Sequence, residues 1–236
     1  MSVQTIILVT LAILIGGNIF GFIYSLLVLK TDIFKKFRIQ EKPYQEGVLG
    51  KRLPLFLLNL IILAIFSAGG VYMLYEYFDT SWPAWWVIVV QVIFVFLIDD
   101  VWFYFAHRWM HENKYILKKI HSIHHRAFTP FPLEYLYVHP FEWMIGIIGT
   151  FAGWIIVLTI MPINIYAFWL FALLRNLHEI HIHSDLKIPV LKNIPIISPV
   201  EDHDLHHAKL DGNYASTFRI WDRVFKTRFV DQEKSK

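Results

Sequence analysis

Histidine is the residue type whose placement in this chain points most directly to chemistry. All 12 histidines lie between His107 and His207, in less than half of the 236 residues. Random placement would confine all of them to such a window roughly 4 times in 100,000, so the clustering indicates a shared role. Eight of them form three short motifs: His107 and His111 in HRWMH, His121, His124 and His125 in HSIHH, and His203, His206 and His207 in HDLHH.

The spacing within these motifs is that of metal ligands on a helix. Residues three and four positions apart lie on one helical face. We therefore expect HRWMH to direct two imidazoles toward one point, and each H-x-x-H-H motif to direct three. Neutral imidazole suits zinc, iron, copper and nickel, whereas calcium and magnesium prefer oxygen ligands. Eight imidazoles exceed what one tetrahedral site accepts, so the motifs predict two metal ions that share the histidines.

The remaining histidines and one acidic residue can be placed relative to these motifs. On a helix with about 100° per residue, His178 and His181 lie about 60° apart, and His183 lies roughly 140–160° from both. All three cannot face one metal unless the end of the helix unwinds. Asp100 lies seven residues before His107, on nearly the same helical face, and a carboxylate there can orient an imidazole N–H. His139 stands alone in YVHPFE.

Long apolar segments lie next to these motifs. The chain is 56% hydrophobic and 17% charged, against roughly 45–50% and about 25% in soluble domains. A membrane-spanning helix needs about 20 apolar residues, and three such stretches are present: Val3–Leu29, Leu53–Phe78 and Pro83 to about Ala106. Two further apolar segments, Phe141–Ile160 and Pro162–Leu177, predict a helical hairpin, either fully spanning or re-entrant.

The basic residues predict the orientation in the membrane. Of the 22 lysines and arginines, seven lie in 30–52, five in 107–140 and ten in 175–236. In a model with three spans and a hairpin, all of these segments fall on one side, and cytoplasmic loops are enriched in Lys and Arg. The sequence therefore predicts an integral membrane protein with its N-terminus outside and its histidine motifs cytoplasmic. Either the endoplasmic reticulum or a bacterial inner membrane fits this prediction.

The predicted fold is all-α: one membrane domain over residues 1–236, with three spans, a helical hairpin and a cytoplasmic helical cap that carries the histidines. The region that carries all the histidine motifs is expected at 107–228, including the apolar hairpin at 141–177. Because the chain contains no cysteine, disulfides and thiolate ligands are excluded. A net charge of only +3 without a basic aromatic face argues against nucleic acid as a partner. The H-E-x-x-H motif of zinc proteases is also absent.

The order HRWMH, HSIHH, HDLHH resembles the histidine signature of the fatty acid hydroxylase / sterol desaturase superfamily of membrane di-iron enzymes. Within it, the runs PFPLEYLYVHPFE, HIHSDLKIP and HDLHHAKLDGNYASTFRIWDRVFKT are most similar to C4-methyl sterol oxidases. The resemblance covers about residues 95–228. His178 and His181 stand where those oxidases tend to have Glu and Asp, and sphingoid-base hydroxylases share the style of the segment from HRWMH to HSIHH. The substrate therefore stays open.

The resemblance implies a lipid hydroxylase that uses two iron ions, O2 and electrons from an external donor such as cytochrome b5, a ferredoxin or a reductase. The implied substrate is a sterol, fatty acyl or sphingoid lipid. A desaturase on the same scaffold is the alternative within enzymes, and a histidine-rich metal transporter is the alternative from another class. No catalytic residue separate from the metal ligands is implied. The expected ligands are His107, His111, His121, His124, His125, His183, His203, His206 and His207, with His178 as an additional candidate, while Asp100, His181 and His139 are expected to act behind the ligands.

Overall fold

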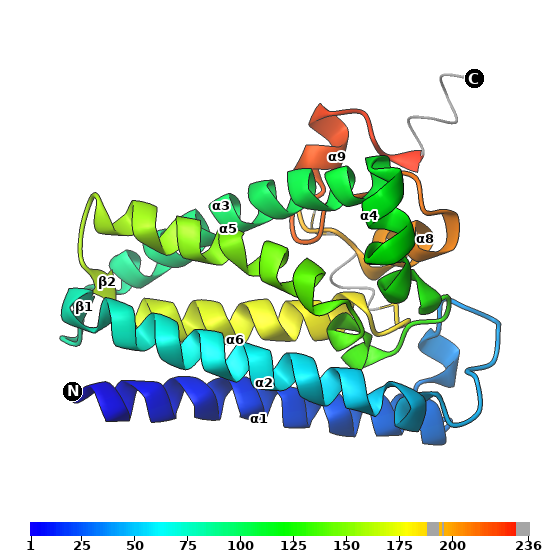
Figure 1. Cartoon of the computed structure of the whole chain (residues 1–236), viewed down its shortest axis with the longest axis horizontal. Coiled ribbons are helices and arrows are strands. Elements are labelled where there is room, and N and C mark those ends of the chain that lie inside the picture. The colour runs from blue at the N-terminus through cyan, green and yellow to red at the C-terminus, as the bar shows by residue number, and fades with distance from the viewer. Residues whose placement is uncertain (188–193, 195, 230–236) are drawn as a thin grey trace.

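The computed structural model describes residues 1–187, 194 and 196–229, and most of these are helical. Five long helices run along the long axis of the molecule, and shorter elements gather at one end (Figure 1). The long helices are α1 (Val3–Lys30), α2 (Val48–Leu74), α3 (Trp85–Glu112), α5 (Pro140–Leu158) and α6 (Ile165–Ile182). The short elements are α4 (Lys114–Lys119), α8 (Val200–Lys209) and α9 (Ile220–Val224), the 3-10 turns η1 (Lys35–Phe37), η2 (Tyr75–Tyr77), η3 (His121–Arg126) and η4 (Pro132–Leu136), and the strands β1 (Phe78–Asp79) and β2 (Ile163–Asn164).

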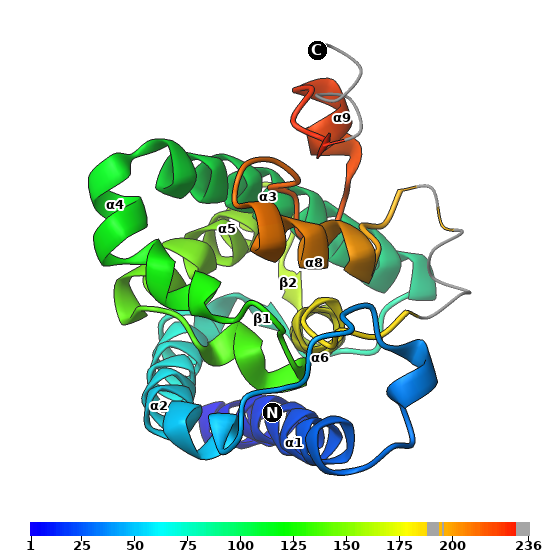
Figure 2. The ribbon, with the colours of Figure 1, turned by 90° about the vertical axis from the view of Figure 1, so that its right-hand side faces the viewer.

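Four helices are long and apolar enough to cross a membrane: α1, α2 with its extension to Tyr77, α3 and α5. They correspond to the three predicted spans and the first arm of the predicted hairpin. The second arm, α6, is not among them, and it carries Arg175 and Glu179. Figure 2 shows α6 near the middle of the bundle, and its main packing partners are α1 and α3. Because α1, α3 and η4 pack against it, α6 can carry polar side chains on its packed faces at membrane depth.

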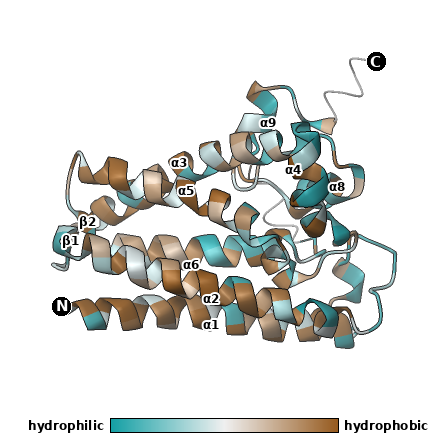
Figure 3. Cartoon of the chain, viewed as in Figure 1, coloured by the Kyte–Doolittle hydropathy of each residue, from teal (hydrophilic) through white to brown (hydrophobic). Residues whose placement is uncertain are grey.

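The two ends of the bundle differ in character. At one end lie the N-terminus and a short parallel pairing of β1 with β2, which joins Phe78 to Ile163 and Asp79 to Asn164. The turn of the hairpin therefore reaches the same end as the α2–α3 turn. Figure 3 shows apolar residues along the helices and hydrophilic residues around α4 and α8 at the opposite end.

Helix α3 extends beyond the predicted end of its span and carries HRWMH as two further turns. It ends at Asn113, whose side chain then accepts hydrogen bonds from the amides of Tyr115 and Ile116 and so begins α4. Along its apolar length α3 packs closely on α5, because Gly149 leaves room for the backbone of Asp99. A Cβ atom at Gly149 would lie 2.9 Å from the carbonyl oxygen of Asp99, and small residues are typical of close helix contacts in membranes.

Candidate metal centre

Nine histidines converge on two adjoining groups at the hydrophilic end of the bundle. Within each group, one nitrogen atom from every ring lies within 4.8 Å of the others, and all nine residues are buried. The first group contains five residues and the second four: His107, His111, His121, His125 and His206 in the first, and His124, His183, His203 and His207 in the second. These nine are the residues expected from the sequence, with His183 joining the three motifs.

The two H-x-x-H-H motifs do not direct three imidazoles to one point, as the sequence analysis expected. Each motif divides two to one: His121 and His125 enter the first group and His124 the second, whereas His203 and His207 enter the second group and His206 the first. The reason for α8 lies in helix geometry. Positions i+3 and i+4 flank position i on opposite sides and are about 100° apart. The imidazoles at i and i+4 can therefore enter one group while the imidazole at i+3 enters the other.

The Nε2 atoms face inward within each group. In the first group, His121 Nε2 lies 2.8 Å from His111 Nε2 and 2.9 Å from His125 Nε2. In the second, His183 and His203 bring their Nε2 atoms within 3.0 Å. A metal bound at about 2.0–2.1 Å from imidazole nitrogen has ligands at right angles separated by about 3 Å. The spacing of the nitrogens therefore fits a metal ion in each group.

Backbone carbonyls fix which nitrogen carries the proton. The Nδ1 atom of His107 donates to the Tyr214 carbonyl at 2.8 Å, His206 Nδ1 to Gly212 at 2.7 Å and His183 Nδ1 to Glu179 at 2.8 Å. Because a carbonyl can only accept, the Nε2 atoms of these neutral rings carry lone pairs. The Nε2 of His206 is buried and has no hydrogen-bond partner among the described residues. A buried lone pair without a donor is the state that a metal ion satisfies.

Burial also keeps these imidazoles neutral. Desolvation is the main cause that lowers the pKa of the histidines on η3 and α8 well below its usual value, and neighbouring histidines add to the effect. Neutral imidazole is the form that coordinates metals. The donor set, the spacing and the protonation state all agree with two metal ions.

Glu142, the first acidic residue of α5, supports the first group from outside. Its Oε1 lies 2.9 Å from Nδ1 of His121, and its side chain is nearly fully buried. A carboxylate in this position holds the ring orientation and raises the basicity of the ligating nitrogen. No role for Glu142 was predicted from the sequence, where it is the last residue of YVHPFE. A lone glutamate at the start of an apolar segment gave no further signal.

Asp100 lies behind the site but contacts no histidine directly. Its carboxylate accepts hydrogen bonds from the amides of Thr217 and Phe218 at 2.7 and 2.9 Å, and from Trp221 Nε1 at 2.8 Å. It thereby anchors the GNYASTF segment, whose Tyr214 carbonyl accepts the proton of His107. The effect of Asp100 on the ligands passes through this loop.

The other three histidines lie outside both groups. His178 Nε2 is 3.3 Å from the Ser216 carbonyl. His139 caps α5, because its Nδ1 accepts a hydrogen bond from the Phe141 amide. His181 lies on the last turn of α6, next to the end of the helix at Ile182.

The loop between α1 and α2 forms hydrogen bonds with the segment that follows α6 and with the middle of α8. Asp185, with a left-handed φ of 59°, accepts hydrogen bonds from Arg38 Nε and from the amides of Ile39 and Gln40. The side chain of Gln40 also donates to Asp204 at 2.8 Å. Since Asp185 and Asp204 lie next to ligand-bearing segments, this loop holds two parts of the second group in place.

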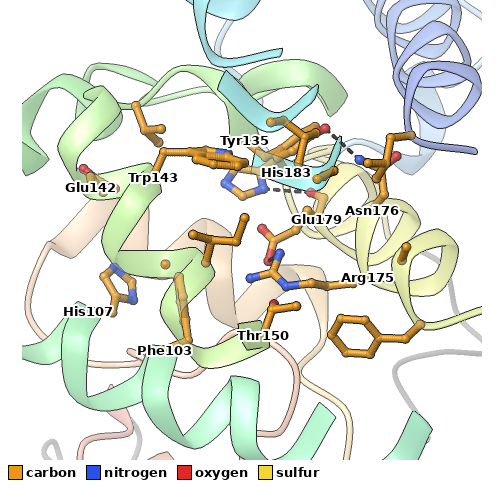
Figure 4. Close-up of a pocket in the computed structure, with 18 of the residues that line it drawn as sticks. Phe103, His107, Tyr135, Glu142, Trp143, Thr150, Arg175, Asn176, Glu179 and His183 are labelled. Carbon is orange, nitrogen blue, oxygen red and sulfur yellow. Dashed lines mark hydrogen bonds and ion pairs between the residues drawn. The ribbon is translucent and has the colours of Figure 1, made fainter. Parts of the chain in front are cut away.

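A cavity leads from the interior of the bundle to the histidines (Figure 4). The space between its lining residues, including the open mouth, amounts to about 1150 Å³. Apolar side chains from four helices line the deeper part, among them Leu14, Leu63, Trp154 and Phe171. At the other end the lining includes His107, His121, His124, His183 and His203.

Fold and site together define a helical bundle with four helices apolar enough to span a membrane and, at one end, histidine groups that could hold metal ions. A model of the fatty acid hydroxylase family matches residues 92–227. The chain belongs to this family, which confirms the resemblance seen in the sequence.

Curated relatives agree with the family. Methylsterol monooxygenase 1 from Gallus gallus is 33% identical over 215 residues, covering 88% of this chain and 70% of that protein. The protein of the same name from Rattus norvegicus shows the same identity and coverage. A very-long-chain aldehyde decarbonylase, GL1-11, from Oryza sativa subsp. japonica is 33% identical over 213 residues, covering 86% of this chain and 78% of that protein. No solved structure matches.

Proposed function

We propose that this protein is a di-iron lipid hydroxylase that inserts oxygen into an unactivated C–H bond. The observation that carries the proposal is the pair of histidine groups at the end of an apolar cavity. The relatives named methylsterol monooxygenase support an oxygenase, and the apolar lining supports a lipid substrate.

The nine histidines would hold two iron ions, five in the first group and four in the second. Iron bound there would supply the activation of dioxygen. The protein's own residues then have three tasks: the carbonyls of Tyr214, Gly212 and Glu179 keep the Nε2 lone pairs inward, Glu142 orients His121, and the apolar cavity excludes water while it holds the lipid.

The overall reaction converts a C–H bond and O2 into a C–O–H group and water, and it consumes two electrons and two protons. The chain contains no cysteine for an iron–sulfur cluster and no Gly-rich dinucleotide motif. The electrons would therefore come from an external donor such as cytochrome b5, a ferredoxin or a reductase. We further propose that the histidine end faces the cytoplasm, supported by the distribution of Lys and Arg.

The direct test compares His206→Ala with His181→Ala. His206 lies in the first group, whereas His181 lies outside both on the nearby end of α6. Iron content is measured by elemental analysis, and hydroxylated lipid is measured by mass spectrometry with isotope-labelled dioxygen and a supplied electron donor. We expect His206→Ala to lose iron and product and His181→Ala to keep both. Wild-type protein that binds no iron, or a product without labelled oxygen, would contradict the proposal. An unsaturated product would indicate a desaturase.

A further inference from the structure

Among the described residues that line the cavity, a single one is a lysine or an arginine. Arg175 lies on α6, and its Nε is 2.7 Å from Asp99 Oδ2 on α3, while its Nη1 is 3.3 Å from Glu179 Oε1. Thr150 on α5 donates to the other oxygen of Asp99 at 2.8 Å. Figure 4 shows the guanidinium between Glu179 and Thr150, directed into the cavity. Charged groups at membrane depth are costly and are usually kept for a function.

Arg175 keeps a hydrogen-bond donor free for a ligand. The ion pairs use Nε and Nη1, and among the described residues Nη2 has no hydrogen-bond partner. The side chain is 24% exposed, and Arg175 lines the cavity, into which its guanidinium points in Figure 4. Glu179 also lines the cavity, and its hydrogen bonds from Arg175 and Ser216 both end on Oε1. Its Oε2 is thus available as an acceptor.

The charges of Asp99, Arg175 and Glu179 determine which kind of polar group can bind here. Two carboxylates, Asp99 and Glu179, flank one guanidinium, so the cluster carries a net negative charge and disfavours a further anion. A hydroxyl group suits it best, because a hydroxyl can accept from Nη2 and donate to Glu179 at the same time. A hydrocarbon would leave the buried donor unsatisfied.

Resting on the proposed function, we infer that Arg175 and Glu179 form a subsite for a lipid hydroxyl group. The substrate is then an uncharged lipid alcohol, and it is anchored by its oxygen while another carbon is oxidised. Arg175 precedes His183 by eight residues, which is about 12 Å along the helix axis. Glu179, which the guanidinium contacts, precedes His183 by four residues, about 6 Å along the axis. The anchoring oxygen is therefore expected beside the histidine groups.

The test measures equilibrium binding of radiolabelled octadecanol, octadecane and octadecanoate to the full-length protein in nanodiscs, with affinities expressed per mole fraction in the bilayer. We expect octadecanol to bind about 10-fold or more tightly than octadecane, since a hydrogen bond to a charged group changes an affinity by about this factor. Octadecanoate should bind more weakly than octadecanol. Equal binding of alcohol and alkane, or tighter binding of octadecanoate, would overturn the inference.

Two variants assign the preference to the subsite. Arg175→Lys keeps a positive charge beside Asp99 but loses the forked donors, and it should lower the alcohol-to-alkane ratio at least several-fold. Arg52→Lys is the matched control, because Arg52 is a buried arginine that pairs with Glu134 at 3.0 Å outside this cavity. An unchanged ratio in Arg175→Lys would overturn the assignment. Should this variant fail to fold, Glu179→Gln replaces it, and octadecanoate should then gain affinity relative to octadecanol.

Binding of these probes requires neither iron nor turnover, so the two proposals fail separately. A protein that hydroxylates lipids but shows no alcohol preference refutes the subsite alone. A protein that shows the preference but binds no iron refutes the di-iron function alone.

Discussion

The contact between Glu142 and His121 gives the sharpest test of how the first histidine group is built. Glu142→Gln keeps the size of the side chain and a carbonyl acceptor but removes the charge. A hydrogen bond to a charged group is worth about 1.5–3 kcal/mol and a neutral one about 1 kcal/mol. The variant should therefore bind metal at the first group about 2- to 30-fold more weakly, and Glu142→Ala about 10- to 100-fold more weakly.

The assay is an anaerobic titration of metal-free protein with cobalt(II), followed by its visible absorption against a competing chelator. His121 belongs to the five-histidine group only, so one of two binding phases should weaken while the other keeps its wild-type affinity. Glu112→Gln is the control, because Glu112 forms an exposed pair with Arg108 at the end of α3. Wild-type affinity in Glu142→Ala, or equal weakening of both phases, would refute this reasoning.

Three further predictions follow from the packing, the buried imidazoles and the charge distribution. Gly149→Ala should lower the melting temperature in detergent, because its Cβ would meet Asp99, whereas Gly146→Ala, with no atom within 4 Å, should be neutral or stabilising by up to about 1 kcal/mol. Metal-free protein should lose stability as the pH falls below about 6.5. Burial lowers the pKa of the imidazoles in the folded state, so the unfolded chain binds more protons than the folded one. Thermal unfolding across pH 5–8 measures this trend. Stability that rises on acidification would contradict it. In this cysteine-free chain, Ser81→Cys and Lys118→Cys should be labelled by an impermeant thiol reagent from opposite sides of the membrane, and labelling of both from one side would contradict the proposed topology.

Much of the fold was predictable because its determinants are local. Long apolar runs indicate spans whatever they pack against, and i, i+4 spacing brings His107 and His111 onto one face of α3. The nine converging histidines were expected for the same reason, with the resemblance adding His183. The boundaries shifted where polar residues continued a helix: α3 runs on to Glu112 because HRWMH keeps its helical spacing and Asn113 ends it.

The rest of the site depends on contacts between distant segments. The division of each H-x-x-H-H motif between two groups requires the position of the partner helices, which spacing alone does not contain. The same holds for Asp100, whose carboxylate binds the amides of a loop more than 100 residues away rather than an imidazole. Arg175 and Asp99 are separated by 76 residues and meet only once α3 and α6 pack together.

The division of the adjacent pairs His124–His125 and His206–His207 has a mechanical consequence. The rings within each pair are 5.6 and 6.0 Å apart, and one member belongs to each group. Each of the two pairs thus links the two groups through adjacent residues, whose Cα atoms are about 3.8 Å apart. These two links limit how far the groups can separate. Spanning helices tilt when bilayer thickness changes, and such tilting moves η3 and α8 as bodies without stretching either pair. The spacing within the two pairs is therefore kept, whereas His107 and His111 move with α3.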